Sequence, residues 1–369
     1  MSEEIRIPQG MRDLIQDEVI RKQQLKNRIE EVFEKSGYSE IITPAIEYYN
    51  TYENAFSSMQ DEEMYKFFDQ DGRILTLRVD MTVPIARVCA SKFTNTEPPY
   101  RFRYCSDVFK VRHTFAGKRS QVTDCGIELI GMDESADLEV LSTALDAMAS
   151  FGIEDYTLEI GNSSFLKKAC RAVNMDDDTM RILADLIDRK SMVELEEYLS
   201  LLNLSEEVSS FFLLLPMLGG KADVLELAEK VSFNEDLRNE VNKLKVLAGQ
   251  LKELGYEDRI TFDFGKAPHL DYYTGIIFEG YVSGSGSSVL SGGRYDNLLS
   301  SFGRDLPACG FSIKLDYLLE LVPAFRRRRI RLLYPKGKEV EAVLKARELR
   351  EEADVELTVY DGETLEVAL

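Results

Sequence analysis

The chain has 369 residues, of which 44% are hydrophobic and 30% are charged, as is typical of a globular protein with two or three domains. Its formal net charge of −20 argues against tRNA or another nucleic acid as a partner, because such a chain would repel a phosphate backbone. The apolar run at 211–215 is too short to span a bilayer, and the first residues lack the apolar core of a signal peptide, so no membrane role is expected.

The first predicted elements are a helix and a strand. Residues 21–36 carry Leu25, Ile29 and Phe33 at helical spacing, with charges on the opposite face, which predicts a long amphipathic helix. A glycine turn leads into the β-branched run 39–44, which ends in a proline and predicts a strand that stops or lies at an edge.

A second strand is predicted over 74–83, followed by a helix from Pro84. Alternation along this strand places Asp80 and Thr82 on one face. A carboxylate and a hydroxyl two residues apart suit an α-ammonium group, because the charge-assisted hydrogen bond is strong and the hydroxyl fixes its direction. An equally good interpretation is that they cap the next helix.

Two further strands are predicted over 100–111 and 121–130, joined by a loop with Gly117, Lys118 and Arg119. On the second strand Asp124 and Glu128 are four residues apart and therefore share a face. Taken alone, Glu128 fits a solvated strand residue as well as a binding residue.

From about 165 to 254 the sequence is rich in Leu, Glu, Lys and Asp at helical spacing, which predicts an all-helical insertion. Its acidic runs, such as 176–178 and 194–197, favour solvated helix faces over a protein contact.

The block from 259 to 317 predicts an antiparallel sheet, with a strand at 260–264 and a Gly/Ser hairpin loop at 283–288. It carries two motifs, Ala-Pro-His-Leu-Asp-Tyr-Tyr-Thr-Gly from 267 and Ser-Gly-Gly-Arg-Tyr-Asp from 291. Beyond it, an arginine run at 326–329, a charged helix and a strand at 355–360 predict a small strand-helix-strand segment. The arginine run favours a surface or interface role over RNA binding.

These blocks resemble the class II histidyl-tRNA synthetases. The motif from 267 resembles their histidine-reading motif, the helix and strand at 21–44 resemble motif 1 of the dimer interface, residues 99–131 resemble motif 2, and Gly310–Tyr317 resembles motif 3. The resemblance implies an α+β fold with a class II synthetase-like antiparallel sheet flanked by helices. It implies a core of residues 1–164 and 256–323, a helical insertion at 165–255, and a short C-terminal α/β segment at 324–369.

The sequence departs from the synthetase pattern at the residues that activate the amino acid. Lys110, Pro268 and Tyr317 stand where the family places arginines, and Arg112 replaces a motif 2 glutamate. A lysine lacks the bidentate fork of arginine, and a neutral phenol cannot replace a cation at a triphosphate. We therefore expect that adenylation is lost and that the protein is not an enzyme.

Residues 1–325 are similar to the ATP phosphoribosyltransferase regulatory subunits, a family of synthetase paralogues in histidine biosynthesis. This resemblance implies a cytoplasmic subunit that is required by a short-form catalytic subunit, forms a dimer, and conveys feedback inhibition by L-histidine, without tRNA or membrane partners. It implies that either Arg112 or Arg294 receives the carboxylate of histidine, and that Asp271 belongs to the substrate-reading motif. The implied histidine-binding residues are Asp80, Thr82, Arg112, Asp124, Glu128, Tyr272, Tyr273, Arg294 and Tyr295.

Two other interpretations stay open. The chain could be a histidyl-tRNA synthetase-like enzyme that activates histidine with ATP, or a paralogue that activates an amino acid for an acceptor other than tRNA. The inhibitory histidine could also bind the partner instead of this chain. We expect neither a cofactor nor a metal, since His113 and His269 lack ligand spacing, and we expect a reducing cytoplasm, since the five cysteines form no CxxC pair.

Overall fold

The computed structural model describes residues 7–53, 55, 61–112, 119–267, 272–323 and 328–368. The chain divides into two compact units, one formed by residues 1–13 and 25–322 and the other by residues 14–24 and 323–369. The sequence motifs discussed above for histidine binding all belong to the first unit. His113, Gly117, Lys118, Pro268, His269 and Asp271 lie outside the described residues.

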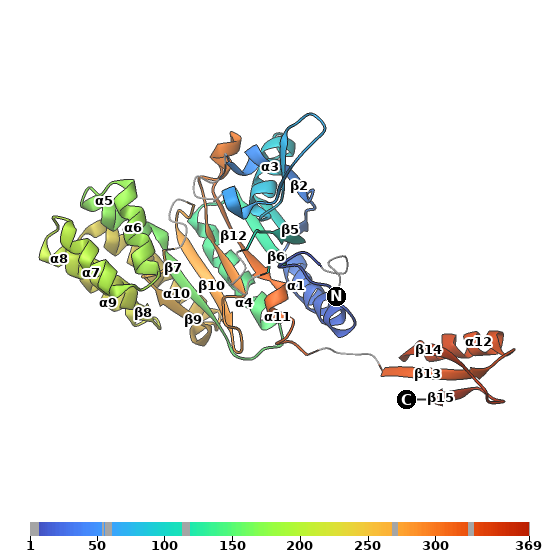
Figure 1. The fold of residues 1–369 in the computed structure, drawn as a ribbon. Coiled ribbons are helices and arrows are strands. Elements are labelled where there is room, and N and C mark those ends of the chain that lie inside the picture. The colour runs from blue at the N-terminus through green and yellow to red at the C-terminus, as the bar shows by residue number, and fades with distance from the viewer. Residues whose placement is uncertain are drawn as a thin grey trace. The chain divides into compact units, whose positions relative to one another are not determined.

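Within the described residues, nine strands form one mixed sheet, here called the large sheet (Figure 1). Neighbouring strands are antiparallel except for the parallel pairs β1–β5 and β7–β9. In spatial order the strands are β1 (Ser39–Glu40), β5 (Tyr100–Phe109), β6 (Gln121–Ile130), β12 (Ala308–Lys314), β11 (Leu290–Arg294), β10 (Ile276–Val282), β7 (Tyr156–Asn162), β9 (Ile260–Asp263) and β8 (Gly219–Gly220).

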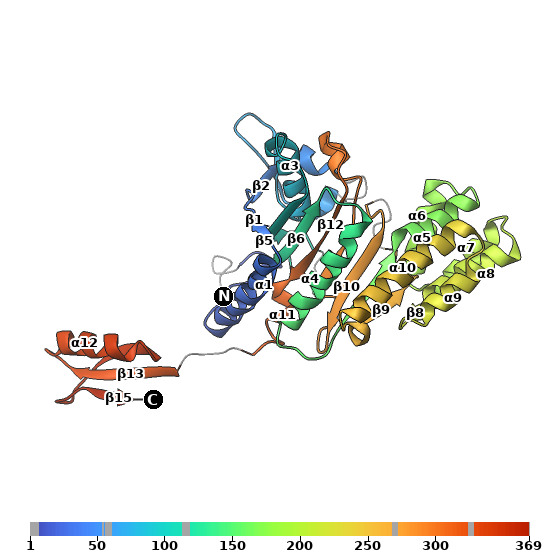
Figure 2. The ribbon, with the colours of Figure 1, turned by 180° about the vertical axis from the view of Figure 1, so that it is seen from behind.

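One face of the large sheet is apolar and carries helix α4 (Asp137–Ala149) and residues 25–35 of helix α1 (Asp17–Lys35) (Figure 2). The apolar stripe of α1 is buried there, and the Phe33 ring meets Phe311 of β12 edge-on with centroids 5.7 Å apart. Residues at alternate positions of β6, such as Ile127, belong to the same core. The predicted helix at 21–36 is thus confirmed, with its start four residues earlier.

The same face holds a cross-strand disulfide. Cys105 of β5 lies opposite Cys125 of β6 and is bonded to it, whereas Cys89, Cys170 and Cys309 are free and buried. The spacing of the cysteines along the chain contains no sign of this pair, because the antiparallel register of the two strands brings it together.

A second, three-stranded sheet is formed within the described residues by β2 (Ile46–Tyr48), β4 (Ile74–Leu77) and β3 (Lys66–Phe68), beside helices α2 (Tyr49–Glu53) and α3 (Thr82–Lys92). Two strand predictions are wrong here. The run at 39–44 forms only the two-residue β1, and β4 ends at Leu77 instead of continuing to residue 83. The chain turns after Leu77, and Thr82 begins α3 instead of ending a strand.

Residues 163–253 form six helices and the short strand β8. Their first turns carry the caps that such sequences predict, because the side chains of Asn162, Asp176, Ser205 and Asn234 each accept a backbone N–H of the following turn. The acidic run at 176–178 is therefore the cap and first turn of α6, as the helix dipole favours. The helices are α5 (Ser163–Ala172), α6 (Asp177–Asp188), α7 (Met192–Leu201), α8 (Glu206–Leu214), α9 (Val224–Val231) and α10 (Glu235–Glu253).

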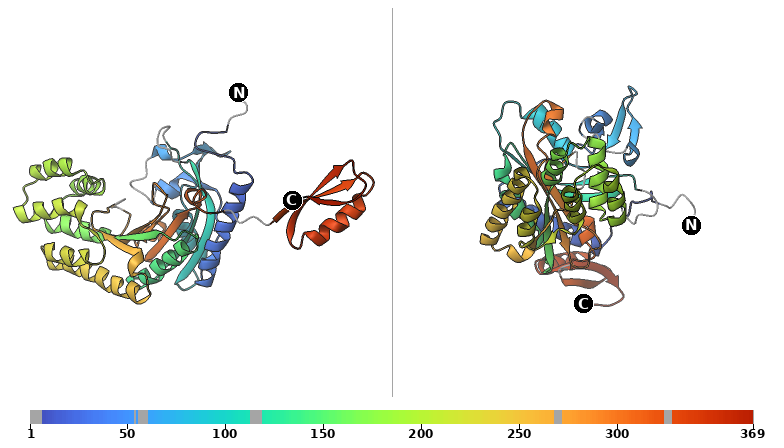
Figure 3. Two further views of the ribbon diagram at one scale, coloured as in Figure 1. Left: turned by 90° about the horizontal axis from the view of Figure 1, so that it is seen from below. Right: turned by 90° about the vertical axis from the view of Figure 1, so that its left-hand side faces the viewer.

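After α11 (Leu315–Leu318), the second unit holds the strand order β14-β13-β15 with one helix, α12, against the sheet (Figure 3). The predicted strand-helix-strand segment is confirmed, and a third strand that the sequence did not predict completes it. The arginines of β13 are exposed, and Arg329 pairs with Glu356 at 3.5 Å. The elements are β13 (Arg328–Pro335), α12 (Glu339–Leu349), β14 (Ala353–Tyr360) and β15 (Glu366–Ala368).

Candidate functional site

The face of the large sheet opposite the apolar core is polar. On β6, Asp124 and Glu128 point to this face, and register pairing sets them opposite Lys314 and Gly310 of β12. Gly126 lies between the two acids, opposite Tyr104 of β5. The regular alternation of both strands therefore builds one polar face from residues that are far apart in the sequence.

Glu128 is the central group of this face. Its side chain is buried, with 1% exposed, and it accepts hydrogen bonds from the Thr82 hydroxyl at 2.8 Å and from the Tyr295 hydroxyl. Burial raises the pKa of Glu128 to about 8, although the two hydroxyl donors work against that rise. Near neutral pH the carboxyl group is mostly protonated, so it can donate one hydrogen bond and accept others. Such a group suits an imidazole, which also carries a donor and an acceptor.

Three tyrosines form the wall next to Glu128. The rings of Tyr272 and Tyr295 are stacked, with centroids 5.3 Å apart and planes 9° from parallel. Tyr273 meets Tyr272 nearly at right angles, with centroids 4.8 Å apart. This close arrangement needs glycine at two positions, because a Cβ on Gly293 would collide with the Tyr273 ring and a Cβ on Gly310 would collide with the Glu128 carboxylate. Stacked rings beside a buried acid favour a flat, polar ligand group.

Asp80 performs the capping role that the sequence left as an alternative. Its Oδ1 accepts the backbone N–H of Val83 at 2.9 Å, in the first turn of α3. Burial raises the pKa of Asp80 to about 6, while the charge of Lys110 opposes this rise. The cap also fixes the start of α3, where Thr82 donates to Glu128.

Arg294 is fully engaged with protein groups. Its Nε and Nη2 donate to Asp137, its Nη1 donates to Asp296 and to the carbonyl of Met132, and its Nη2 also donates to the carbonyl of Asp133. These bonds use all five donors of the guanidinium group, whose side chain is 1% exposed. Arg294 therefore joins β11 to the start of α4 and has no donor left for a ligand carboxylate.

Arg112 and Asp124, in contrast, have unsatisfied atoms. The nearest carboxylate oxygen to Arg112 Nη1 belongs to Glu63, at 3.9 Å. Among the described residues, neither Arg112 Nε nor Asp124 Oδ1 has a hydrogen-bond partner, although both atoms are buried. Burial raises the pKa of Asp124, and the charge of Lys314 opposes it. Of the two arginines expected to receive a carboxylate, only Arg112 keeps an available donor.

The sequence did not single out three residues of this face. Tyr104 lies between Asp124 and Glu128 in the cross-strand register, and Ser312 and Lys314 follow Gly310 along β12 on the same face. The alternating patterns at 100–109 and 308–314 were their only signal, and they become informative only with the pairing of β6 with β5 and β12. Tyr317, which stands where synthetases have an arginine, is half-buried. It packs against the apolar core of the large sheet and against a second buried cluster that includes Tyr52 and Tyr104.

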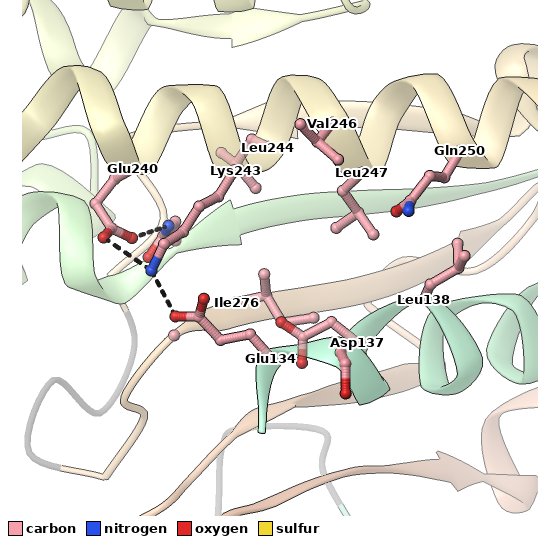
Figure 4. A pocket seen from close by; sticks show the side chains of 13 residues that line it. Glu134, Asp137, Leu138, Glu240, Lys243, Leu244, Val246, Leu247, Gln250 and Ile276 are labelled. Atoms are coloured by element: carbon pink, nitrogen blue, oxygen red, sulfur yellow. Dashed lines mark hydrogen bonds and ion pairs between the residues drawn. The ribbon is translucent and has the colours of Figure 1, made fainter. Parts of the chain in front are cut away.

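A separate pocket of about 420 Å³ lies between the start of α4, helix α10 and residues 275–276 (Figure 4). Lys243 of α10 bridges Glu134 at 2.5 Å and Glu240 at 3.3 Å across it. The sequence gave no indication of this pocket, because its walls come from segments about a hundred residues apart. Asp137, which holds Arg294, is one of its lining residues.

The described residues lack two further kinds of feature. In those parts of the chain no group of three or more His, Cys, Asp or Glu side chains is placed to hold a metal ion. No helix of the described residues is long and apolar enough to cross a membrane.

The comparisons with known proteins agree on one family. Residues 10–318 match the family described as Histidyl-tRNA synthetase. An ATP phosphoribosyltransferase regulatory subunit of Acetivibrio thermocellus is 37% identical over 313 residues, which cover 85% of this chain and 75% of that protein. A protein of the same name from Clostridium kluyveri is 34% identical over 367 residues, covering 97% of this chain and 94% of that protein.

Solved structures show the same likeness. The crystal structure of an ATP phosphoribosyltransferase regulatory subunit/histidyl-tRNA synthetase from Bacillus halodurans matches with a TM-score of 0.88 at 31% identity, covering 99% of this chain and 95% of that one. A histidyl-tRNA synthetase from Nostoc sp. matches with a TM-score of 0.81 at 21% identity, which shows the fold alone. The predicted class II synthetase-like α+β fold is confirmed, and the chain belongs to the family of ATP phosphoribosyltransferase regulatory subunits.

Proposed function

We propose that this chain binds L-histidine on the polar face of the large sheet and thereby controls a separate, short-form catalytic subunit of ATP phosphoribosyltransferase. The observation that carries the proposal is the buried Glu128, which two hydroxyl groups orient beside a stack of tyrosines and whose pKa burial raises. A donor and an acceptor on one carboxyl group can both be used by imidazole, whereas an aliphatic side chain would leave them unpaired.

The proposed binding site consists of Asp80, Thr82, Asp124, Glu128, Tyr272, Tyr273 and Tyr295, with Arg112 near its rim and Arg294 as a structural support. Within it, the acids Asp80 and Asp124 supply negative charge for the α-ammonium group of the ligand, as their burial beside each other suggests. None of these residues is proposed to do chemistry.

Regulation follows by linkage. If histidine binds one quaternary state of the complex more tightly, it shifts the population toward that state and changes the rate of the catalytic subunit. In the same proposal the catalytic subunit requires this chain for activity, and neither tRNA nor a cofactor takes part. The proposed setting is the cytoplasm, where reductants keep most thiols reduced, so the Cys105–Cys125 bond is expected to be open there and closed in the oxidised protein.

A dimer of this chain is part of the proposal. Large apolar side chains are exposed on β2, β3 and β4 and on the segment after β1, including Ile42 at 81% and Phe68 at 72%. Exposed apolar side chains of this size favour a contact with a second copy over exposure to water.

The test is the formation of phosphoribosyl-ATP by the short-form catalytic subunit alone, by this chain alone and by the mixture. We expect activity that depends on the mixture, and inhibition by L-histidine. The alternative, a synthetase-like enzyme, predicts histidine-dependent exchange of pyrophosphate into ATP by this chain alone. We expect no exchange, because Lys110 and Tyr317 stand where the synthetases have arginines. Exchange without stimulation of the catalytic subunit would overturn the proposed function.

A further inference from the structure

Lys314 is the last residue of β12 and lies opposite Asp124 of β6. Gly310, which faces Glu128, is four residues earlier on the same strand and therefore on the same face. At about 3.3 Å per residue, the backbone distance between Gly310 and Lys314 is about 13 Å. Lys314 thus stands at the end of the polar face that lies away from the buried acid Glu128.

The ammonium group of Lys314 is poorly paired for its surroundings. Among the described residues its hydrogen-bond contact is the hydroxyl of Ser291 at 3.5 Å, and no carboxylate lies in ion-pair contact with it. Burial lowers its pKa, and the negative charge of Asp124 only partly opposes this effect. A charged group that is removed from water needs a partner to stay charged at low cost.

Lys266, in the loop after β9, provides a comparison, because it pairs with carboxylates of the same sheet. Its side chain is 11% exposed, and it pairs with Glu159 at 2.9 Å and with Glu279 at 2.5 Å. Those two carboxylates raise the pKa of Lys266 although its burial acts in the opposite direction. The two carboxylates therefore offset the cost of burying the charge of Lys266. Lys314 has no carboxylate in ion-pair contact among the described residues.

Other polar atoms near Lys314 are also unsatisfied. Arg112 Nε, whose charge lowers the pKa of Lys314, is buried and has no hydrogen-bond partner among the described residues, and the same holds for Asp124 Oδ1 opposite Lys314. Ser312 Oγ, on the same strand, is buried beside the side chains of Asp124 and Tyr104, and its hydroxyl acts to lower the pKa of both. Buried polar groups are seldom left unpaired in folded proteins, and a group of them at one place indicates a missing ligand. The ammonium group of Lys314 and the guanidinium N–H of Arg112 are donors and suit an anionic ligand group, whereas Asp124 Oδ1 is an acceptor and suits the α-ammonium group of the same ligand.

We propose that Lys314 receives the α-carboxylate of the bound amino acid, with Arg112 as a supporting donor. This inference rests on the proposed histidine site and adds to it the residue that recognises the ligand's main chain. Arg294 cannot take this role because its five donors are bonded within the protein. A histidine whose imidazole meets Glu128 and an extended lysine side chain together span about the 13 Å between the two strand positions.

The test compares L-histidine with histamine, which has the same imidazole and amine but no carboxylate. Isothermal titration calorimetry on the full chain gives the ratio of their dissociation constants. We expect the unmodified protein to prefer histidine. In Lys314→Met this preference should fall by roughly 10- to 100-fold, the usual effect of losing a charge-assisted hydrogen bond. The affinity for histamine should stay the same.

Three further variants make the result specific. Lys266→Met removes another mostly buried lysine and should leave the ratio unchanged, whatever its effect on stability. Lys110→Met tests the rival cation. If Lys314→Met folds poorly because Asp124 loses its nearby charge, the double variant Lys314→Met/Asp124→Asn removes both charges, and its ratio should fall as well.

The possible outcomes separate this inference from the proposed function. An unmodified protein that binds neither histidine nor histamine would overturn the proposed histidine site, and this inference with it. Binding of histidine that Lys314→Met leaves intact would overturn the role of Lys314 alone. Loss of the preference in Lys110→Met but not in Lys314→Met would assign the carboxylate to Lys110 instead.

Discussion

The hydroxyl of Tyr295 donates a hydrogen bond to Oε2 of Glu128, across the space between strand β6 and the turn that follows β11. The Tyr295 ring also stacks on Tyr272, so one residue orients the buried acid and forms part of the aromatic wall. These two functions can be separated by experiment, because a phenylalanine at position 295 keeps the ring and loses the donor.

We expect Tyr295→Phe to weaken histidine binding and to lower the free energy of unfolding by about 1–3 kcal/mol, since a buried carboxyl oxygen loses its partner. The control is Tyr38→Phe. Tyr38 is also buried and also donates to a glutamate, Glu139, at 3.0 Å, but it belongs to the apolar core on the other face. The control should lose stability to a similar extent and keep its histidine affinity, as measured by calorimetry. Equal losses of affinity in both variants would contradict the assigned role of Tyr295.

The raised pKa of Glu128 predicts how stability depends on pH. Its pKa is about 8 in the folded chain and about 4.5 in the unfolded one, so between these values the unfolded state has lost a proton that the folded state keeps. This group therefore favours the folded state less as the pH rises from about 4.5 to about 8, by at most about 1.4 kcal/mol per pH unit.

Urea unfolding of the unmodified protein and of Glu128→Gln from pH 5 to pH 9 measures this contribution. The advantage of the glutamine variant, relative to the unmodified protein, should grow with pH up to about 8 and then level off. Asp80 and Asp137, whose pKa values burial raises to about 6, remain in both proteins and so largely cancel in the difference. A difference that does not change with pH would show that Glu128 is ionised in the folded chain.

Gly310 is expected to tolerate no side chain. A Cβ there would collide with the Glu128 carboxylate and with the backbone carbonyl of Ile127, which cannot move without disturbing the sheet. Gly310→Ala should therefore destabilise the fold by roughly 1–3 kcal/mol, as overpacking does, and should also abolish histidine binding. Gly249→Ala, near the C-terminal end of α10 with open space around it, is the control and should be neutral or stabilising. Thermal unfolding and calorimetry check both, and a stable, histidine-binding Gly310→Ala would contradict the close packing described.

The disulfide between Cys105 and Cys125 closes a loop with a sequence separation of 20. A loop of this length predicts that its reduction lowers the free energy of unfolding by about 3 kcal/mol. Thiol titration should find three cysteines in the unfolded oxidised chain and five after reduction. Cys105→Ser/Cys125→Ser should unfold at the same denaturant concentration with and without reductant. Equal stability of the unmodified chain in both conditions would show that the bond adds nothing to the fold.

The sequence by itself determined much of this protein. Strands β5 and β6 were predicted to within two residues, because their alternation and the loop between them are local properties. Helical spacing likewise predicted an all-helical insertion from about 165 to 254, which the helices of residues 163–253 confirm. The motifs predicted the family and placed Glu128 and the tyrosines together, and the structure brings Glu128, Thr82 and Tyr295 into hydrogen-bond contact.

Only the tertiary structure decided the rest. Asp80 and Thr82 follow an alternating pattern, yet the chain turns after Leu77 and uses Asp80 as a cap, because the first turn of α3 needs an acceptor. Arg294 and Lys314 are both cations near the motifs. Arg294 is paired with a carboxylate at the start of α4, whereas Lys314 has no ion-pair partner among the described residues. This difference depends on the cross-strand register and on contacts with the start of α4. Such contacts join residues that are far apart along the chain, so no local pattern in the sequence contains them.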